Sequence, residues 1–364
     1  MGPEAITAMV TMQFVGAISG VVLGQLAARR PKMPFVLWPN LAARSAVAAL
    51  AFARQPAAFL VIASLFYFLL NVSGPAYSSI MRTNYSHANR GRLMGNIRIL
   101  VTLVMAAVSA GAGLVLIESE SLVRWLFLVS GVCGVLSSLV FATVKVRRDV
   151  EIPRAAAERP RGASIRILAA NRPFLVFLAV LVLCATPDKL SVPLEPLWMV
   201  DVLHIGYAQA SFVLGTVVAV ASVAGYFLWA RALKRTNSFT LLAIVVFVFA
   251  GRYVALALAR TGLQLIPMSI LSGLSNAGWD LVPLFCILDL ADAGSFTLAI
   301  GLNATLFGIR GTIGPSIGTL LYSSGVPLNI LFLGIAALIA CGGGMMLWFG
   351  RRHGSPGGQG GAVS

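Results

Sequence analysis

Residues 231–260 read RALKRTNSFTLLAIVVFVFAGRYVALALAR, a long apolar stretch that follows three basic residues and ends at a single arginine. A bilayer core of about 30 Å needs about 20 apolar residues per helical crossing, so residues 238–259 are predicted to span a membrane. The basic cluster at one end and the lone Arg260 at the other predict that the first end is cytoplasmic, because cytoplasmic loops keep the excess of Lys and Arg.

The same pattern recurs along the whole chain, which is 58% hydrophobic and 11% charged. A soluble domain usually carries about 25% charged residues. We expect about 11 transmembrane helices, near residues 4–27, 34–53, 56–81, 94–117, 121–144, 173–199, 206–230, 238–259, 263–289, 295–322 and 326–349. The odd-numbered loops hold most of the Lys and Arg, so topology explains the net charge of +15 better than nucleic-acid binding does.

The polar, Arg-rich segment 145–172 is predicted to be a cytoplasmic loop that divides the chain. Similar glycine-rich helix ends occur at nearly the same spacing before and after it, which suggests an internal repeat. The fold class predicted is therefore an all-α polytopic membrane protein with two pseudo-symmetric helical bundles. The expected division is an N-terminal bundle at 1–144, the loop at 145–172, a C-terminal bundle at 173–350 and a disordered cytoplasmic tail at 351–364.

Two loops carry a family resemblance. Residues 24–32, GQLAARRPK, resemble the signature that follows the second helix of the major facilitator superfamily, and residues 89–95, NRGRLMG, resemble its loop between helices four and five. The resemblance covers nearly the whole chain and implies two bundles that rock around a central site. It assigns a cytoplasmic gating role to Gly24, Arg29, Arg30, Lys32, Arg90, Gly91 and Arg98.

The chain also departs from the family pattern. Ala28 stands where the family signature usually has Asp, and Pro31 stands where it has Gly. Because residues 24–32 match the loop after helix two, the family's first helix has no counterpart, and eleven spans would place Met1 outside the cell. A start codon assigned too late and a truncated paralogue both explain this difference.

A charge inside an apolar span is costly and is therefore a functional candidate. Asp188 lies near the middle of span 173–199 and is the first choice for a residue that couples transport to a proton or ion; the alternative is a structural ion pair. Neighbours on a regular helix do not face each other, so Lys189 is expected to have a different partner. Three prolines between residues 187 and 196 predict that this helix is broken.

Polar residues at helical spacing mark two further spans that match cavity-lining helices of the family. Tyr67 and Asn71 are four apart, as are Asn276 and Asp280, so each pair shares a helix face. Trp279 adds an aromatic platform, and Arg310 is the expected cationic partner in the pocket. The alternative is ordinary helix packing through small residues and hydrogen bonds, with Asp280 bridging to an arginine such as Arg310.

Other features of the spans are expected to be structural. Arg44 and Arg252 match supporting helices of the family, where we expect them to pair or to snorkel. Gly311, Gly314 and Gly318 provide the small-residue spacing that lets helices approach closely.

The sequence thus favours a secondary active transporter that moves a small molecule by alternating access. The rival interpretation is a non-transporting receptor or scaffold, or a degenerate transporter paralogue. No Ser/His/Asp arrangement or metal-ligand spacing is found in the sequence, so neither an enzyme nor a cofactor is expected. The predicted partners are a small-molecule substrate, a coupling proton or ion and the lipid bilayer, with no nucleic acid. The predicted location is the inner or plasma membrane, with a cytoplasmic C-terminus.

Overall fold

The computed structural model describes residues 12, 14–28, 30–85, 93–105, 107, 108, 122–146, 163–205, 209, 211–292 and 295–353. These residues form helices joined by short connections, and no strand occurs among them. The all-α class is therefore confirmed for the described part of the chain. Contacts between Cα atoms divide the chain into two compact units, and the predicted division at the central loop stays a prediction.

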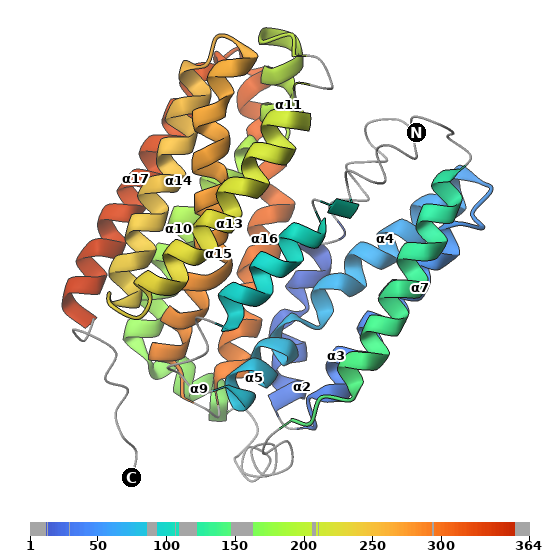
Figure 1. Ribbon diagram of the computed structural model, residues 1–364. Helices are drawn as coiled ribbons and strands as arrows, with labels where there is room; N and C mark the ends of the chain where they lie inside the picture. The colour runs from blue at the N-terminus through green and yellow to red at the C-terminus, as the bar shows by residue number, and fades with distance from the viewer. Residues whose placement is uncertain are drawn as a thin grey trace. The chain divides into compact units, whose positions relative to one another are not determined.

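The first unit comprises Met1–Ser86, Ser109–Asn171 and Ala291–Thr312. Within it, α3 packs along α7 and α4 packs against α3 (Figure 1). Close approach of α3 and α7 depends on Gly131, because a Cβ atom there would overlap the backbone of Ala48. The helices of this unit are α2 (Gly20–Ala28), α3 (Met33–Leu50), α4 (Pro56–Val72), α5 (Gly74–Asn84), α7 (Val123–Ala142), α9 (Ala163–Ala170) and the first part of α16 (Phe296–Ser323).

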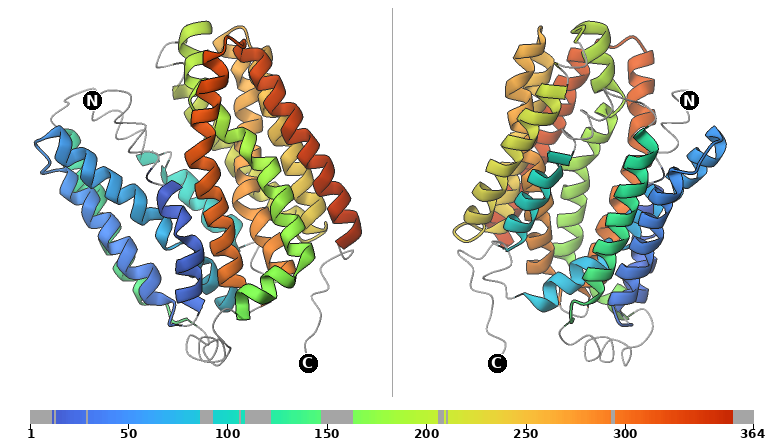
Figure 2. Two further views of the ribbon diagram at one scale, coloured as in Figure 1. Left: turned by 180° about the vertical axis from the view of Figure 1, so that it is seen from behind. Right: turned by 45° about the vertical axis from the view of Figure 1, so that its right-hand side comes forward.

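The second unit comprises His87–Val108, Arg172–Leu290 and Ile313–Ser364. Within it, α14 packs against α17 and α15, α13 against α15, and α10 against α17 (Figures 1 and 2). Its long helices are Leu93–Met105, α10 (Arg172–Ser191), α13 (Val218–Ala232), α14 (Ser238–Leu258), α15 (Ile266–Leu290), the second part of α16 and α17 (Leu328–His353). Short helices are α11 (Leu194–Leu197), η2 (Trp198–Val202), η3 (Ser211–Val217) and η4 (Gly262–Leu265).

Eight of the described helices are long and apolar enough to cross a bilayer, judged by length and composition. They coincide with eight of the expected spans; six of them follow residue 171. Of the other expected spans, residues 34–53 form the 18-residue helix α3, whereas residues 4–27 and 94–117 are described only in part. Large apolar side chains such as Val140 and Leu320 are 68% exposed on these helices, as lipid-facing residues would be.

Prolines interrupt two of the helices. The α10 helix contains Pro187 and ends at Ser191, and α11 begins at Leu194, which confirms the predicted break. The span 56–81 is likewise divided into α4 and α5 at Ser73, just before Pro75. Broken helices at membrane depth occur where protein or water covers the freed backbone groups.

Glycines on α16 bring its second part against α10. A Cβ atom at Gly314 would overlap the side chain of Lys189, and one at Gly318 would overlap the carbonyl oxygen of Leu190. The predicted close packing at these glycines is therefore confirmed. It places the helix directly beside the charged end of α10.

Candidate functional site

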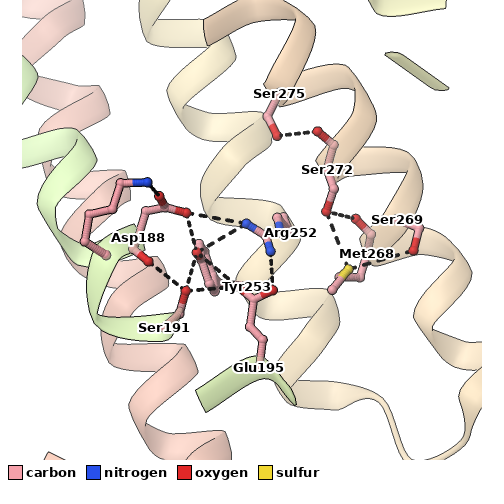
Figure 3. Close-up of polar contacts among 10 residues, drawn as sticks. Asp188, Ser191, Glu195, Arg252, Tyr253, Met268, Ser269, Ser272 and Ser275 are labelled. Atoms are coloured by element: carbon pink, nitrogen blue, oxygen red, sulfur yellow. Dashed lines mark hydrogen bonds and ion pairs between the residues drawn. The ribbon is translucent and has the colours of Figure 1, made fainter. Parts of the chain in front are cut away.

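A network of charged side chains occupies the broken end of α10 in the second unit. Figure 3 shows Asp188 and Ser191 of α10 and Glu195 of α11 converging on Arg252 and Tyr253 of α14. The break at Ser191 makes this possible, because it lets the chain turn and present Glu195 toward the same point.

The phenol of Tyr253 lies at the centre of this network. Its hydroxyl donates a hydrogen bond to Oδ1 of Asp188 at 2.8 Å and lies 2.8 Å from the Ser191 hydroxyl. Ser191 also lies 2.9 Å from Oε1 of Glu195. The ring is completely buried. Tyr253 therefore joins the two carboxylates of the network through hydroxyl groups.

Two cations balance the two carboxylates. The guanidinium of Arg252 contacts Oε2 of Glu195 at 2.5 Å and Oδ1 of Asp188 at 3.5 Å. The ammonium of Lys189 lies 2.6 Å from Oδ2 of Asp188. All four side chains are between 13% and 18% exposed. Burial removes water from these charges, which costs desolvation free energy. Their mutual pairing offsets part of that cost.

The contact between Lys189 and Asp188 corrects one expectation from the sequence. Adjacent positions on a helix point in different directions, and we expected the two residues to have separate partners. The prediction was wrong because the long, flexible lysine side chain folds back to its neighbour at the end of the helix. The expectation that Arg252 forms a pair is confirmed.

A row of serines on α15 is hydrogen-bonded within its own helix. Ser272 donates to the carbonyl of Met268 at 2.7 Å, and Ser275 donates to the carbonyl of Ser272 at 3.1 Å (Figure 3). Serines bonded in this way are satisfied without a ligand. They support helix packing between α15 and its neighbours.

Trp279 lies farther along α15. Its ring packs edge-on against Phe249, with centroids 5.8 Å apart. Its indole Nε1 is buried and makes no hydrogen bond to any residue that the structure describes. The packed ring agrees with the structural alternative for this residue, and its role in ligand contact stays a prediction.

Asn276 and Asp280 are both exposed on α15, as their spacing of four residues predicts. Oδ2 of Asp280 accepts a hydrogen bond from the hydroxyl of Tyr226 at 2.6 Å and lies 3.7 Å from the guanidinium of Arg98. The arginine beside Asp280 is thus Arg98, whereas the sequence suggested Arg310. Arg98, expected to gate the cytoplasmic side, belongs to this cluster.

A cavity of about 780 Å³ opens beside Tyr226. Its walls come from helix Leu93–Met105 and from the end of α13. The lining residues are Gly95, Asn96, Ile99, Tyr226, Phe227, Ala230, Arg231, Lys234 and Arg235. Three of them are basic and none is acidic, so the cavity favours an anionic solute over a cationic one.

The remaining predicted pocket residues belong to the first unit. Tyr67 and Asn71 lie half-buried on α4, and Tyr67 contacts the ring of Phe66 at a centroid distance of 5.2 Å. The guanidinium of Arg310 lies 5.5 Å from the ring centroid of Phe307. All three residues lie in the first unit, and the prediction that they line a pocket together stays a prediction.

The gating residues from the family resemblance are only partly described. Gly24 lies within α2, Arg30 is exposed, and Lys32 is 1% exposed at the start of α3. Arg29, Arg90 and Gly91 lie outside the described residues.

No family model matches the sequence, and no curated protein sequence matches it. Among solved structures, the human organic anion transporter MFSD10 matches with a TM-score of 0.69 at 14% identity, covering 93% of this chain and 83% of that one. A variant of the E. coli fucose:proton symporter matches with a TM-score of 0.63 at 13% identity, covering 97% of this chain and 95% of that one. At these identities the likeness concerns the fold alone, which this chain shares with the two transporters.

Proposed function

We propose that this protein is a secondary active transporter that moves a small molecule across a membrane by alternating access. One fold hosts many activities, so function is assigned from the residues of a site. The observation that carries the proposal is the balanced network of Asp188, Lys189, Glu195 and Arg252, which joins α10 and α14, two helices long and apolar enough to cross a membrane. Charges at membrane depth are expensive and typically serve transport or proton relay.

Asp188 is the residue we propose for coupling. It joins Lys189 on its own helix to Arg252 and Tyr253 on α14. Protonation would remove the negative charge that Asp188 presents to Lys189 and Arg252. The link between α10 and α14 would weaken, so a proton bound here would favour a different packing of the two helices.

The basic cavity beside Tyr226 supports an anionic substrate. Its volume of about 780 Å³ falls within the range of about 300–1,000 Å³ typical of small-molecule sites. The human organic anion transporter with this fold is consistent with that substrate class. The phenol of Tyr226 also bonds to Asp280, which connects the cavity to the polar face of α15.

The test is transport by purified protein in proteoliposomes, using labelled anionic, neutral and cationic compounds with and without a pH gradient. We expect an anionic compound to accumulate when a gradient is imposed. Asp188→Asn should abolish gradient-driven accumulation and retain exchange of the compound at equal concentrations, because the variant cannot carry the coupling proton. Full pH-dependent accumulation by this variant would show that the coupling residue lies elsewhere.

Asp289→Asn is the matched control. Asp289 is a carboxylate near the end of α15 that accepts a hydrogen bond from Ser238 at 2.5 Å, and the network does not include it. This variant should accumulate the compound as the unmodified protein does. If neither protein transports any compound of the panel, the non-transporting receptor or scaffold becomes the better interpretation.

A further inference from the structure

An arginine of the first unit lies within the apolar helix α3, and no carboxylate of a described residue pairs with it. Arg44 occupies the second half of α3, and its side chain is partly buried. We expected it to pair or to snorkel, yet it makes no ion pair or hydrogen bond with a described residue. An intramembrane cation normally finds a compensating negative group, so its surroundings point to what that group is.

Arg44 lines an open cavity of about 260 Å³ bordered by α3, α7 and the break between α4 and α5. The polar side chains of the lining are Asn40, Arg44, Ser73, Tyr77, Ser137 and Ser138, and none of the lining residues is acidic. Gly134 of α7 makes room for the arginine, because a Cβ atom there would lie 2.5 Å from Cδ of Arg44.

Two polar side chains of this lining already donate hydrogen bonds to backbone carbonyls of their own helices. Asn40 donates to the carbonyl of Val36 at 2.8 Å, and Ser138 donates to the carbonyl of Gly134 at 2.9 Å. The guanidinium of Arg44 and the hydroxyl groups of Ser73 and Ser137 make no hydrogen bond with a described residue. The cavity therefore offers donors and a positive charge.

We infer that this cavity binds a small anionic group, a carboxylate or a phosphate, through Arg44. The planar guanidinium bonds such groups with two parallel hydrogen bonds. The volume is below the range of about 300–1,000 Å³ for drug-sized ligands, which favours a single small group. This site is independent of the proposed coupling network and shares no residue with it.

The anionic group has two sources that the structure allows. One is a free small anion. The other is the phosphate of an anionic lipid that enters past Ser137, which is exposed on α7 beside the exposed side chains of Leu136 and Val140. Basic pockets between membrane helices bind lipid headgroups in this way.

Two measurements on the purified full-length protein distinguish these sources. Thermal unfolding in neutral detergent is titrated with inorganic phosphate, and native mass spectrometry counts adducts of phosphatidylglycerol against phosphatidylcholine. Arg44→Gln should weaken binding of the responding probe about tenfold or more, because a charged hydrogen-bonding group is lost. A phosphate response identifies a free anion, and a phosphatidylglycerol response identifies a lipid.

Two further variants keep the proposal falsifiable. Ser137→Leu leaves the charge in place and fills the mouth of the cavity, so it should reduce binding as Arg44→Gln does, even if the latter fails to fold. Arg54→Gln removes an equal charge from an exposed position of the same unit and should bind normally. The proposal is overturned if neither probe binds, or if Arg54→Gln weakens binding as much as Arg44→Gln.

Discussion

The hydroxyl of Tyr253 lies within 3.4 Å of Asp188, Ser191 and Glu195, which come from two other helices. The charges of Asp188 and Glu195 are visible in the sequence because they interrupt an apolar span. Tyr253 gives no such signal, since an aromatic residue within an apolar helix resembles any other packed side chain. Its role emerges only from contacts between residues more than 50 positions apart, which periodicity along one helix cannot reveal.

Arg252 and Glu195 offer a test of how the network is held. Arg252→Met should lower the stability of the protein by about 3–5 kcal/mol, because Glu195 is left buried without its cation. The double variant Arg252→Met, Glu195→Leu should recover much of this loss, since it removes the uncompensated charge as well. Unfolding of the detergent-solubilised proteins, followed by circular dichroism, measures the difference.

Arg260→Met serves as the control for this pair of variants. Arg260 is exposed just beyond the end of α14, so its replacement should change stability by less than about 0.5 kcal/mol. A double variant less stable than Arg252→Met would mean that Glu195 has other stabilising contacts and that Arg252 is not its principal partner.

The shapes of individual helices followed well from local chemistry. The prolines between residues 187 and 196 predicted the break that lies between Ser191 and Leu194, because proline removes a backbone donor and crowds the preceding turn. The glycines of α16 predicted close packing. The pairing of Lys189 with Asp188 was missed, because helix geometry fixes where a side chain starts and not where a long, flexible one ends.

The contact between α16 and α10 can be tested with a single methyl group. Gly318→Ala places a Cβ atom onto the carbonyl oxygen of Leu190, so α16 must move away. Overpacking of this kind costs about 1–3 kcal/mol. We expect a lower midpoint of thermal unfolding in detergent for this variant.

Gly334→Ala on α17 is the matched substitution. A Cβ atom there meets nothing within 4 Å, so the change should be neutral or stabilising by up to about 1 kcal/mol, as expected for glycine in a helix interior. Equal midpoints for the two alanine variants would show that Gly318 does not lie against Leu190.

For the molecule as a whole, the distribution of charge along the chain was the most informative property. It predicted a multi-pass helical membrane protein, and the fold shared with two solved transporters confirms that class. The sequence did not identify Arg98 as a partner of Asp280. Such pairings depend on which helices become neighbours, and composition and spacing do not determine that.

The most direct test of the transporter fold is the side of the membrane on which two tags lie. Six of the helices that can cross a bilayer follow residue 171, so a tag after Arg159 and a tag after Ser364 should lie on the same side. Labelling with a membrane-impermeant reagent, in intact cells and in permeabilised cells, measures this. We predict that both tags are labelled only after permeabilisation. Labelling of one tag in intact cells and of the other only after permeabilisation would require an odd number of crossings between them and would contradict the carrier fold.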